Sequence, residues 1–394
     1  MTRRAIRLLM VVMAFALIAT ACSSDSDDTT TTAAAAEETT TTEAMAEETT
    51  TTEAMAEGLA CDEPVKVGVI TDQTGALAIY GAHIMASFPL GMEYATGAAA
   101  SGDTYMLDEC PIEVIYKDDQ SDPEASVTLA RELIEVDGVD IIVGSVSSGV
   151  TAGIQALALE NDVIHIAAPA AANDLTGATF NPNSFRTSRN NYQDGVALCE
   201  YLPTIYSTFV QIAPDYNFGY GGAQAYRDAC TLNGGTFVSD DIFAPADTTD
   251  FTPYMEQILD SGAEAWLVTW AGGGFVPMLQ SATDLGVTEE MALGAAFVDN
   301  VVLPTFFANA IGTTSGILYH YTQPDNAVND WLVSKAAEAG TFPDLFWADG
   351  MNAAIMVVEA LKATGGDASA DALRTAMEGM SFEGPKGLIE IRAE

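Results

Sequence analysis

Positively charged residues are scarce in this sequence, in which 14 Lys and Arg stand against 56 Asp and Glu. Ten of the acids lie in residues 23–57 and three of the arginines lie near the start, which leaves 46 acids and 11 bases elsewhere. The electrostatic field of such a chain opposes the approach of nucleic acid and of anionic membranes. We therefore expect no nucleic-acid partner and interpret the acidity as a heavily hydrated surface suited to a saline habitat.

Histidine is also rare, and none of the three histidines stands in a recognisable relation to a nucleophile. The run from Gly144 to Gly149 differs from the Gly-x-Ser-x-Gly pattern of a nucleophile elbow. The glycines of Gly219-Tyr220-Gly221-Gly222 miss the dinucleotide-binding spacing. The cysteine spacing does not resemble a metal site. The sequence therefore predicts neither an enzyme, nor a cofactor, nor a metal centre.

The first residues predict an export signal. A basic start, Thr2–Arg7, precedes an apolar stretch, Leu8–Leu17, and small residues lead to Cys22. This order predicts a lipoprotein signal peptide over residues 1–21, with Cys22 lipidated as the new N-terminus. The alternatives are an ordinary signal peptide with an incidental cysteine and, because of the paired arginines, twin-arginine export. The apolar run is too short to span a bilayer, so we expect a protein outside the cytoplasm that contacts the membrane only through the Cys22 lipid.

Residues 22–60 predict a disordered acidic tether. They contain blocks of four threonines, and the unit Glu-Thr-Thr-Thr-Thr-Glu-Ala-Met-Ala-Glu occurs twice in succession, from Glu38 and from Glu48. No Lys or Arg lies between residues 23 and 57. Such a composition cannot bury enough apolar surface to offset the entropy of ordering, and its acids repel one another.

The remaining residues alternate apolar strands with helices, which predicts the α/β class with two doubly wound parallel-sheet lobes. Helix boundaries are marked by Asp122 as a cap, by Pro123 in the first turn and by Gly138 at the end. We assign 61–188 and 323–380 to the first lobe, and 189–322 and 381–394 to the second. The predicted strands are Val65–Ile70, Ile112–Tyr116, Ile141–Val143 and Val163–Ile166, then Thr208–Ile212, Thr236–Phe243, Ala265–Thr269, Met291–Ala295 and Gly316–Tyr319.

Four cysteines remain beside Cys22, and an oxidising compartment allows three ways of pairing them. Cys61 and Cys110 each precede a strand, and both sulfurs lie at one sheet edge if those strands are parallel neighbours. Cys199 and Cys230 each lie near the end of a helix beside the same strand. We therefore predict Cys61–Cys110 and Cys199–Cys230.

Ligands of such sheets bind beyond the carboxyl ends of the strands. The loops at those ends in the first lobe are Thr71–Gly81, Gly144–Thr151 and Ala168–Thr176. Ser147 and Ser148 place hydroxyls beside the free N–H groups of a helix start, which suits a carboxylate. Simple helix capping is the alternative interpretation.

At these loops the chain resembles the branched-chain (hydrophobic) amino-acid-binding family, the type I solute-binding proteins of ABC importers. The resemblance implies two lobes that close on a small ligand, a permease that receives it, and a monomer. It also implies that Ser148 and Ala170 hold the ligand's carboxylate and that Tyr80 shapes the pocket. The matching stretches run from Thr74 to Gly81, Asp118 to Pro123, Ser147 to Gly149, Arg186 to Asp194, Thr248 to Tyr254 and Glu383 to Gly387.

The chain departs from that family at two positions. Ala172 stands where the amino-acid binders have a Thr beside the carboxylate, and Ala296 stands where they have a Glu for the ammonium. Either Asp299 or another acid replaces that Glu, or the ligand has no α-amino group. The candidate walls for an apolar or aromatic part of the ligand are Tyr220, Trp270 and Phe297, each of which is equally consistent with core packing.

Two other functions share the fold, namely a ligand-sensing ectodomain and a sugar or amide binder. The resemblance further implies hinges near Arg189 and Gln323. A strand is predicted from Gly387 to Ile391, and the sequence stops three residues later, whereas family members continue. We therefore expect the sequence to be a fragment.

Overall fold

The computed structural model describes residues 59–295, 298–300 and 314–393. These residues belong to a single unit, Ala56–Glu394. The predicted signal peptide, Cys22 and nearly all of the tether lie outside the described residues, as do Ala296 and Phe297. None of the described helices combines the length and the apolar character that a membrane span needs.

The first sheet has six strands in the order β2-β3-β1-β4-β5-β6. All neighbours are parallel except β2 and β3, which form an antiparallel pair. The central strand is almost wholly buried, as continuous apolar runs predict for a sheet covered on both faces. The strands are β1 (Val65–Thr71), β2 (Thr104–Leu107), β3 (Cys110–Asp118), β4 (Ile141–Gly144), β5 (Ile164–Ala167) and β6 (Ser184–Arg186).

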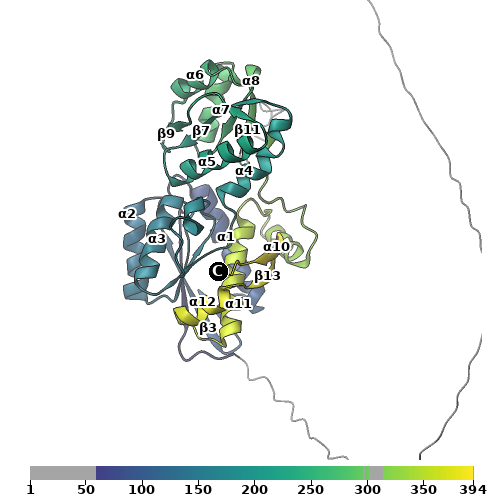
Figure 1. Ribbon diagram of the computed structural model, residues 1–394. Coiled ribbons are helices and arrows are strands. Elements are labelled where there is room, and N and C mark those ends of the chain that lie inside the picture. Colours follow the sequence, from purple (N-terminus) through teal and green to yellow (C-terminus); the bar gives the residue numbers. More distant parts are fainter. Residues whose placement is uncertain (1–58, 296–297, 301–313, 394) are drawn as a thin grey trace, which may run out of the picture. The chain divides into compact units, whose positions relative to one another are not determined.

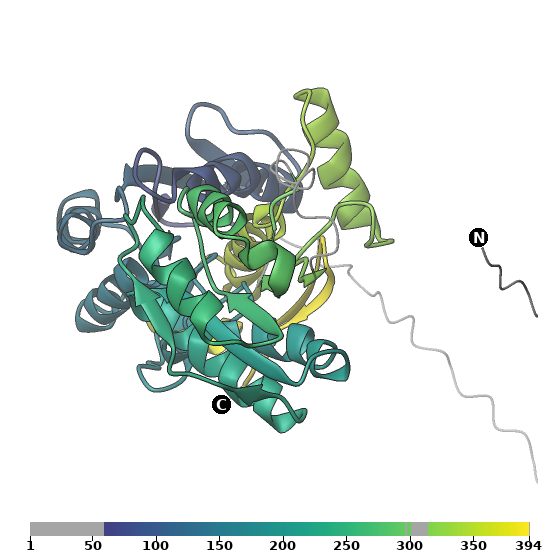
Figure 2. The same ribbon diagram turned by 90° about the horizontal axis from the view of Figure 1, so that it is seen from above.

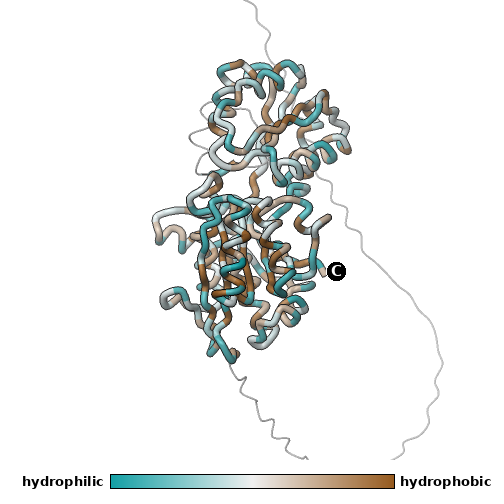
Figure 3. The backbone as a smooth tube through the Cα atoms, turned by 90° about the vertical axis from the view of Figure 1, so that its left-hand side faces the viewer, coloured by the Kyte–Doolittle hydropathy of each residue, from teal (hydrophilic) through white to brown (hydrophobic). Residues whose placement is uncertain are grey.

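Helices cover both faces of this sheet (Figure 1). Val67 and Val69 of β1 pack in the cluster that contains α1 (Ala78–Thr96) and α11 (Trp347–Thr364). Ile70 points to the opposite face and packs with α2 (Pro123–Glu132) and α3 (Ser148–Glu160). The hydrophobic segments accordingly follow the strands inside the fold (Figure 3).

The predicted boundaries of α2 are confirmed. The Asp122 carboxylate accepts hydrogen bonds from the N–H groups of Glu124 and Ala125, and Pro123 occupies the first turn, where no N–H is needed. The helix continues into a π-helical turn, Leu133–Asp137, which ends at Gly138 with φ of 69°. That positive φ favours a residue without a Cβ.

The second sheet is entirely parallel, with the order β12-β11-β10-β7-β8 and with β9 also paired to β7. Helices α4 (Asn191–Cys199) and α5 (Asn217–Leu232) pack on one face. Helices α6 (Thr252–Asp260), α7 (Phe275–Asp284) and α8 (Val287–Glu290) pack on the other. The strands are β7 (Thr208–Pro214), β8 (Thr236–Phe237), β9 (Ile242–Ala244), β10 (Ala265–Val268), β11 (Ala292–Ala295) and β12 (Thr314–Ser315).

Two strand predictions in this part of the chain are wrong. The predicted strand Thr236–Phe243 is divided into β8 and β9, because Asp241 between them bonds Gln211 and Arg227 instead of extending the ladder. The predicted strand Gly316–Tyr319 is irregular. Tyr319 is buried and donates its hydroxyl hydrogen to Asn329, 2.5 Å away, so it packs against a helix start. In the first sheet, neither β2 nor β6 was predicted.

The last elements pack against the helices of the first sheet. Helix α10 (Ala327–Glu338) is the light-green helix at the upper right of Figure 2. It is joined to α1 by an ion pair between Lys335 and Glu93, 2.7 Å. Helix α12 (Ala370–Met377) contacts α11, and β13 (Ser381–Gly384) pairs with β14 (Gly387–Glu390) as an antiparallel hairpin on α11.

Residues 381–394, which we assigned to the second lobe, include this hairpin, and the assignment stays a prediction. The strands of the hairpin pair with each other and join neither of the two larger sheets. Lys386 in its turn donates to the fully buried Asp349 of α11, 2.6 Å away, which fixes the hairpin on that helix.

Both predicted disulfides are confirmed. Cys61 is bonded to Cys110, with Cα atoms 4.7 Å apart, and Cys199 to Cys230, with Cα atoms 4.6 Å apart. The first pair forms because β1 and β3 are parallel neighbours, so the residues before them meet at one edge. The second joins the ends of α4 and α5, which pack side by side.

The disulfide between α4 and α5 should contribute measurably to stability. It closes a segment with a sequence separation of 31 residues, and replacing both of its cysteines by serine should lower the free energy of unfolding by about 2–4 kcal/mol. Urea unfolding of the Cys199→Ser/Cys230→Ser variant beside the wild type measures the difference. Free thiols at these positions in unreduced, denatured protein would contradict the pairing.

Candidate binding site

The loop between β1 and α1 is held by one buried carboxylate. Asp72 accepts hydrogen bonds from the N–H groups of Gly75 and Leu77 and from the hydroxyl of Ser121. A Cβ at Gly81 would lie 1.5 Å from the carbonyl oxygen of Asp72, so only glycine allows the helix to begin this close to the strand. The arrangement fixes Tyr80 in the first turn of α1.

The loops after β4 and β5 are tied to each other. The Ser148 hydroxyl accepts from the N–H groups of Ala171 and Ala172 at 3.3 and 3.1 Å. The Ala170 N–H donates to the carbonyl of Ser145 at 3.2 Å. On the other side, Arg186 donates to the carbonyls of Ala170 and Ala172 at 3.2 and 2.7 Å.

Buried ionisable groups support these loops from beneath. Asp119 accepts from the Ser145 hydroxyl, and burial raises the pKa of Asp119 to about 6. His165 Nε2 lies 2.7 Å from the Gly144 carbonyl, and burial lowers the pKa of His165 to about 4. The histidine is therefore neutral at pH 7 and acts as a hydrogen-bonding brace.

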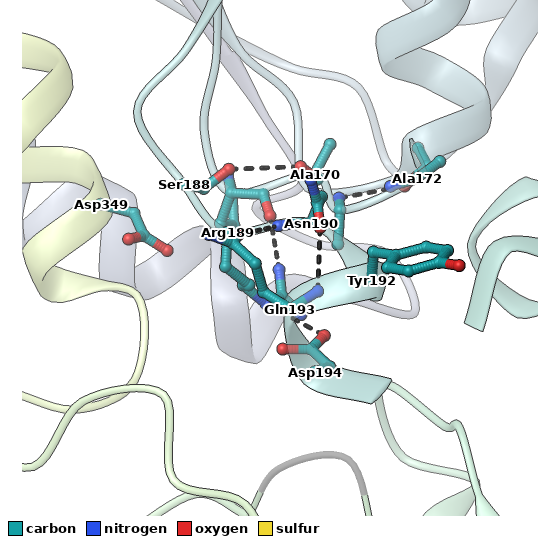
Figure 4. Close-up of polar contacts among 12 residues, drawn as sticks. Ala170, Ala172, Ser188, Arg189, Asn190, Tyr192, Gln193, Asp194 and Asp349 are labelled. Atoms are coloured by element: carbon teal, nitrogen blue, oxygen red, sulfur yellow. Dashed lines mark hydrogen bonds and ion pairs between the residues drawn. The ribbon is translucent and has the colours of Figure 1, made fainter. Parts of the chain in front are cut away.

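Arg189 lies where the chain leaves the first sheet and enters α4 (Figure 4). Its Nη1 donates to the Pro169 carbonyl at 2.9 Å, and its Nε lies 3.4 Å from a carboxylate oxygen of Asp194. The guanidinium also lies over the Phe346 ring, 5.1 Å from its centre. The side chain is 9% exposed, so this segment carries a buried positive charge.

A cavity of about 310 Å³ lies between the loop that precedes α1 and the loop that follows β10. The Tyr80 hydroxyl accepts from the Gly272 N–H at 3.3 Å and lies 3.5 Å from an oxygen of Asp299. Gly272 has φ of 82°, and a Cβ there would lie 2.7 Å from the Ala76 carbonyl, so the loops approach closely because it is glycine. The lining residues are Gly75, Ala76, Ala78, Ile79, Tyr80, Trp270, Gly272, Gly273, Phe275, Val276, Val298 and Asp299.

Tyr80 also lines a second, narrow cavity of about 20 Å³, which is enough for about one water molecule. This space reaches the loops after β4 and β5, and Arg189 forms part of its wall. Its lining residues are Leu77, Tyr80, Val146, Pro169, Ala171, Arg189, Tyr216, Phe218, Ala271 and Phe346.

Two buried polar atoms on the wall of the larger cavity have no hydrogen-bond partner among the described residues. They are one carboxylate oxygen of Asp299 and the indole nitrogen of Trp270. Burial and the negative charge of Asp344 raise the pKa of Asp299 to about 7. The pKa of Tyr80 is raised by burial and by Asp299, against the lowering effect of Arg189. The negative charge of Asp299 and the positive charge of Arg189 therefore act on the pKa of the Tyr80 hydroxyl in opposite directions.

The structure brings together only some of the predicted site residues. Tyr80 and Trp270 line the larger cavity. Tyr220 lies elsewhere, because its position on α5 leaves it 47% exposed, with its hydroxyl donating to Asp215. Phe297 lies outside the described residues. The residues predicted near the ligand's carboxylate are buried after β4 and β5 and line neither cavity. They are Ser147, Ser148, Ala170 and Ala172, the last standing where the amino-acid binders have a Thr. Their neighbours Val146, Pro169 and Ala171 line the narrow cavity.

Other wall residues were not expected from the sequence. Phe275 and Val276 follow β10. Ligands bind beyond the carboxyl ends of parallel strands, and applying this rule to the second sheet would have pointed to both residues. Tyr216 could be found in the same way, since it follows β7. Phe346 precedes a helix far along the chain, and no local pattern marks it as a wall residue.

Comparison with known proteins is consistent with this arrangement. A family model described as periplasmic binding protein matches residues 64–394. The chain belongs to the periplasmic binding protein family. Membership places the protein outside the cytoplasm and identifies it as a solute-binding protein of the ABC-transporter type, and not as an enzyme.

Several members of this family are similar over most of their length. The Leu/Ile/Val-binding protein homolog 6 of Brucella suis is 27% identical over 310 residues, which cover 72% of this chain and 74% of that protein. The crystal structure of an ABC-type branched-chain amino acid transporter from Rhodopseudomonas palustris is 32% identical, with a TM-score of 0.67, and covers 84% of this chain and 88% of that chain.

A solute-binding protein from the same species was crystallised in complex with 3,4-dihydroxybenzoic acid. It is 26% identical to this periplasmic binding protein, with a TM-score of 0.73, and covers 84% of this chain and 89% of that chain. One similar structure is thus described as a branched-chain amino acid transporter, and another contains an aromatic acid.

Ser148 should matter for the stability of this protein. Ser148→Ala removes the acceptor of two buried N–H groups, which should cost about 1–3 kcal/mol of the free energy of unfolding. Ser147→Ala is the matched control, because the Ser147 side chain makes no capping hydrogen bond. Ser147 is also buried, but its loss leaves neither of these N–H groups without an acceptor, so Ser147→Ala should cost clearly less than Ser148→Ala. Equal unfolding midpoints for the two variants in urea would contradict the role of the Ser148 hydroxyl.

Proposed function

We propose that this periplasmic binding protein captures a small hydrophobic amino acid and delivers it to the permease of an ABC importer. The observation that carries the proposal is the position of Tyr80, which lines both cavities between the acid Asp299 and the base Arg189. A free amino acid has an ammonium and a carboxylate on one carbon. The negative charge of Asp299 on one side of Tyr80 and the positive charge of Arg189 on the other suit such a zwitterion.

Asp299 is the proposed partner of the ammonium. The residue is 7% exposed, and one of its carboxylate oxygens has no partner among the described residues. A buried acceptor without a donor costs free energy, and a ligand N–H group removes that cost. Asp299 thus takes the place of the Glu that the resemblance led us to look for at Ala296.

The carboxylate belongs at the other end, near Arg189 and the loops after β4 and β5. Arg189 supplies a buried positive charge there, and Val146, Pro169 and Ala171 form the wall. The sequence analysis linked four positions to the ligand's carboxylate, and we propose that their loops shape this end of the site. The positions are Ser147, Ser148, Ala170 and Ala172. Ser148 contributes by holding two backbone N–H groups in place.

The remaining wall is apolar and sets the preference for a hydrophobic side chain. Ile79, Phe275, Val276 and Val298 face the larger cavity together with Trp270. An apolar side chain that enters this cavity is stabilised by about 25 cal/mol for each Å² of apolar surface removed from water. A polar side chain of the same size would leave its own groups unpaired.

Binding requires the loops to move, because the narrow cavity holds about one water molecule. The proposed hinges are the two segments that connect the sheets, residues 187–190, which include Arg189, and residues 316–326, which include Gln323. Neither segment contains a helix or a strand. Rotation about them would open the space at Tyr80 and close it around the solute.

An aromatic acid is the second candidate. The rings of Tyr80, Trp270 and Phe275 would stack well on it, and a protein that is 26% identical was crystallised with 3,4-dihydroxybenzoic acid. Such a ligand offers no cation to Asp299, and its own charge would be repelled by an ionised Asp299. The amino acid is therefore preferred.

The lipid on Cys22 completes the proposal. Export followed by lipidation would keep the protein at the outer side of the cell membrane, next to the permease. The acidic Thr-rich segment 22–60 would serve as the tether that its composition predicts.

Replacing Asp299 tests the assignment of the ammonium. Asp299→Asn should weaken leucine binding roughly ten- to a hundredfold, because a hydrogen bond to a charged group contributes about 1.5–3 kcal/mol. The same variant should bind 4-methylpentanoate, which is leucine without its amino group, at least as well as the wild type does. Isothermal titration calorimetry in the presence of a chelator measures both affinities.

The exposed Asp215 provides the matched control, since it bonds Tyr220 away from both cavities. Asp215→Asn should leave both affinities unchanged. Equal affinity of the wild type for leucine and 4-methylpentanoate would remove the role of Asp299. Binding of benzoate with no detectable binding of leucine would favour the aromatic acid instead.

A further inference from the structure

Three ionisable side chains meet beside the larger cavity. A ring nitrogen of His83 and a carboxylate oxygen from each of Asp299 and Asp344 lie within 4.8 Å of one another. His83 belongs to α1, Asp299 follows β11, and Asp344 precedes α11. Only Asp299 of the three also lines the cavity, so the cluster lies behind the cavity wall.

The cluster is buried and keeps unused ligand atoms. The exposed fractions are 8% for His83, 7% for Asp299 and 1% for Asp344. Nδ1 of His83 and one oxygen of Asp299 have no hydrogen-bond partner among the described residues. Asp344 accepts from the backbone and side-chain N–H groups of Asn300, at 3.0 and 2.8 Å, and from the N–H of Leu345.

Neighbouring carboxylates that are removed from water repel each other, so either one of them keeps its proton or a cation lies between them. No salt bridge of Asp299 to a Lys, Arg or His is found among the described residues. The short distances between these ligand atoms and their unused nitrogen and oxygen atoms suit a bound metal ion. We propose that His83, Asp299 and Asp344 form a binding site for one divalent cation of the zinc type.

The donor set selects the class of ion. Imidazole nitrogen together with carboxylate oxygen suits Zn²⁺, whereas Ca²⁺ and Mg²⁺ prefer oxygen ligands alone. Zinc bonds to these atoms are about 2.0–2.2 Å long, so the ligand atoms must approach by small side-chain rotations. The contacts of Asp344 with Asn300 and Leu345 orient its carboxylate, as supporting hydrogen bonds do at metal sites.

The ion would join three segments that are distant in the sequence. His83 and Asp344 lie 261 positions apart in the numbering, so no ligand spacing could reveal the site. Bound zinc would connect α1 with the segments after β11 and before α11, and it would stabilise the conformation in which they meet. The inference shares Asp299 with the proposed function, but its ligands His83 and Asp344 do not line the cavity, so zinc titration without solute and leucine titration in the presence of a chelator test the two proposals separately.

Zinc titration of the purified full-length chain, after treatment with a chelator, tests the site. Calorimetry should show one tight equivalent, and zinc should raise the melting temperature. Removing one ligand in His83→Asn or Asp344→Asn should weaken binding at least about a hundredfold, since even supporting residues of metal sites contribute 10–100-fold. His320→Asn, which alters a histidine bonded to Thr322 outside the cluster, should bind zinc as the wild type does.

Circular dichroism establishes that each variant is folded. Affinities of His83→Asn and Asp344→Asn within threefold of the wild type would overturn the site, as would an equal loss in His320→Asn. Should a cluster variant fail to fold, anomalous diffraction from zinc-soaked crystals of the wild type decides the question. A zinc peak between His83, Asp299 and Asp344 supports the site, and a peak only elsewhere, or none, overturns it.

Discussion

Parallel strand pairing is the constraint on which the rest of this structure depends. β1 lies between β3 and β4, and β7 lies between β10 and β8, in each case with all strands running in one direction. Such sheets must be covered on both faces, which requires the helices, and they place all loops at the carboxyl ends along one edge. The cavity walls consist largely of residues from those loops.

The loops themselves are held by buried polar groups. Asp72 fixes the start of α1, Asp119 and His165 support the loop after β4, and Arg186 braces the loop after β5. Each buried group is expensive to leave unpaired, so these bonds specify one loop conformation. A binding protein gains from such preorganisation, because less free energy is lost to ordering when the solute arrives.

Local charge, and not net charge, decides the chemistry of the site. The chain carries a formal charge of −42, yet the buried base Arg189, paired with Asp194, lies on the wall of the narrow cavity, and the acid Asp299 lies on the wall of the larger one. The resemblance of the motifs pointed to Tyr80, and Trp270 was one of three candidate wall residues; both line the larger cavity. The exposure of the Tyr220 side chain could not be predicted, since its position in α5 does not reveal which face of that helix packs against other elements.

The sequence alone determined the α/β class, most strands of both sheets, the caps of α2 and both disulfides. These follow from hydrophobic periodicity and chain direction, which are local properties that the sequence order records. Only the tertiary structure decided that the C-terminal hairpin packs on α11, that Ser148 bonds backbone N–H groups, and that His83, Asp299 and Asp344 meet. Those contacts join residues from separate elements, and they arise only when the packed helices and loops bring distant side chains within bonding distance.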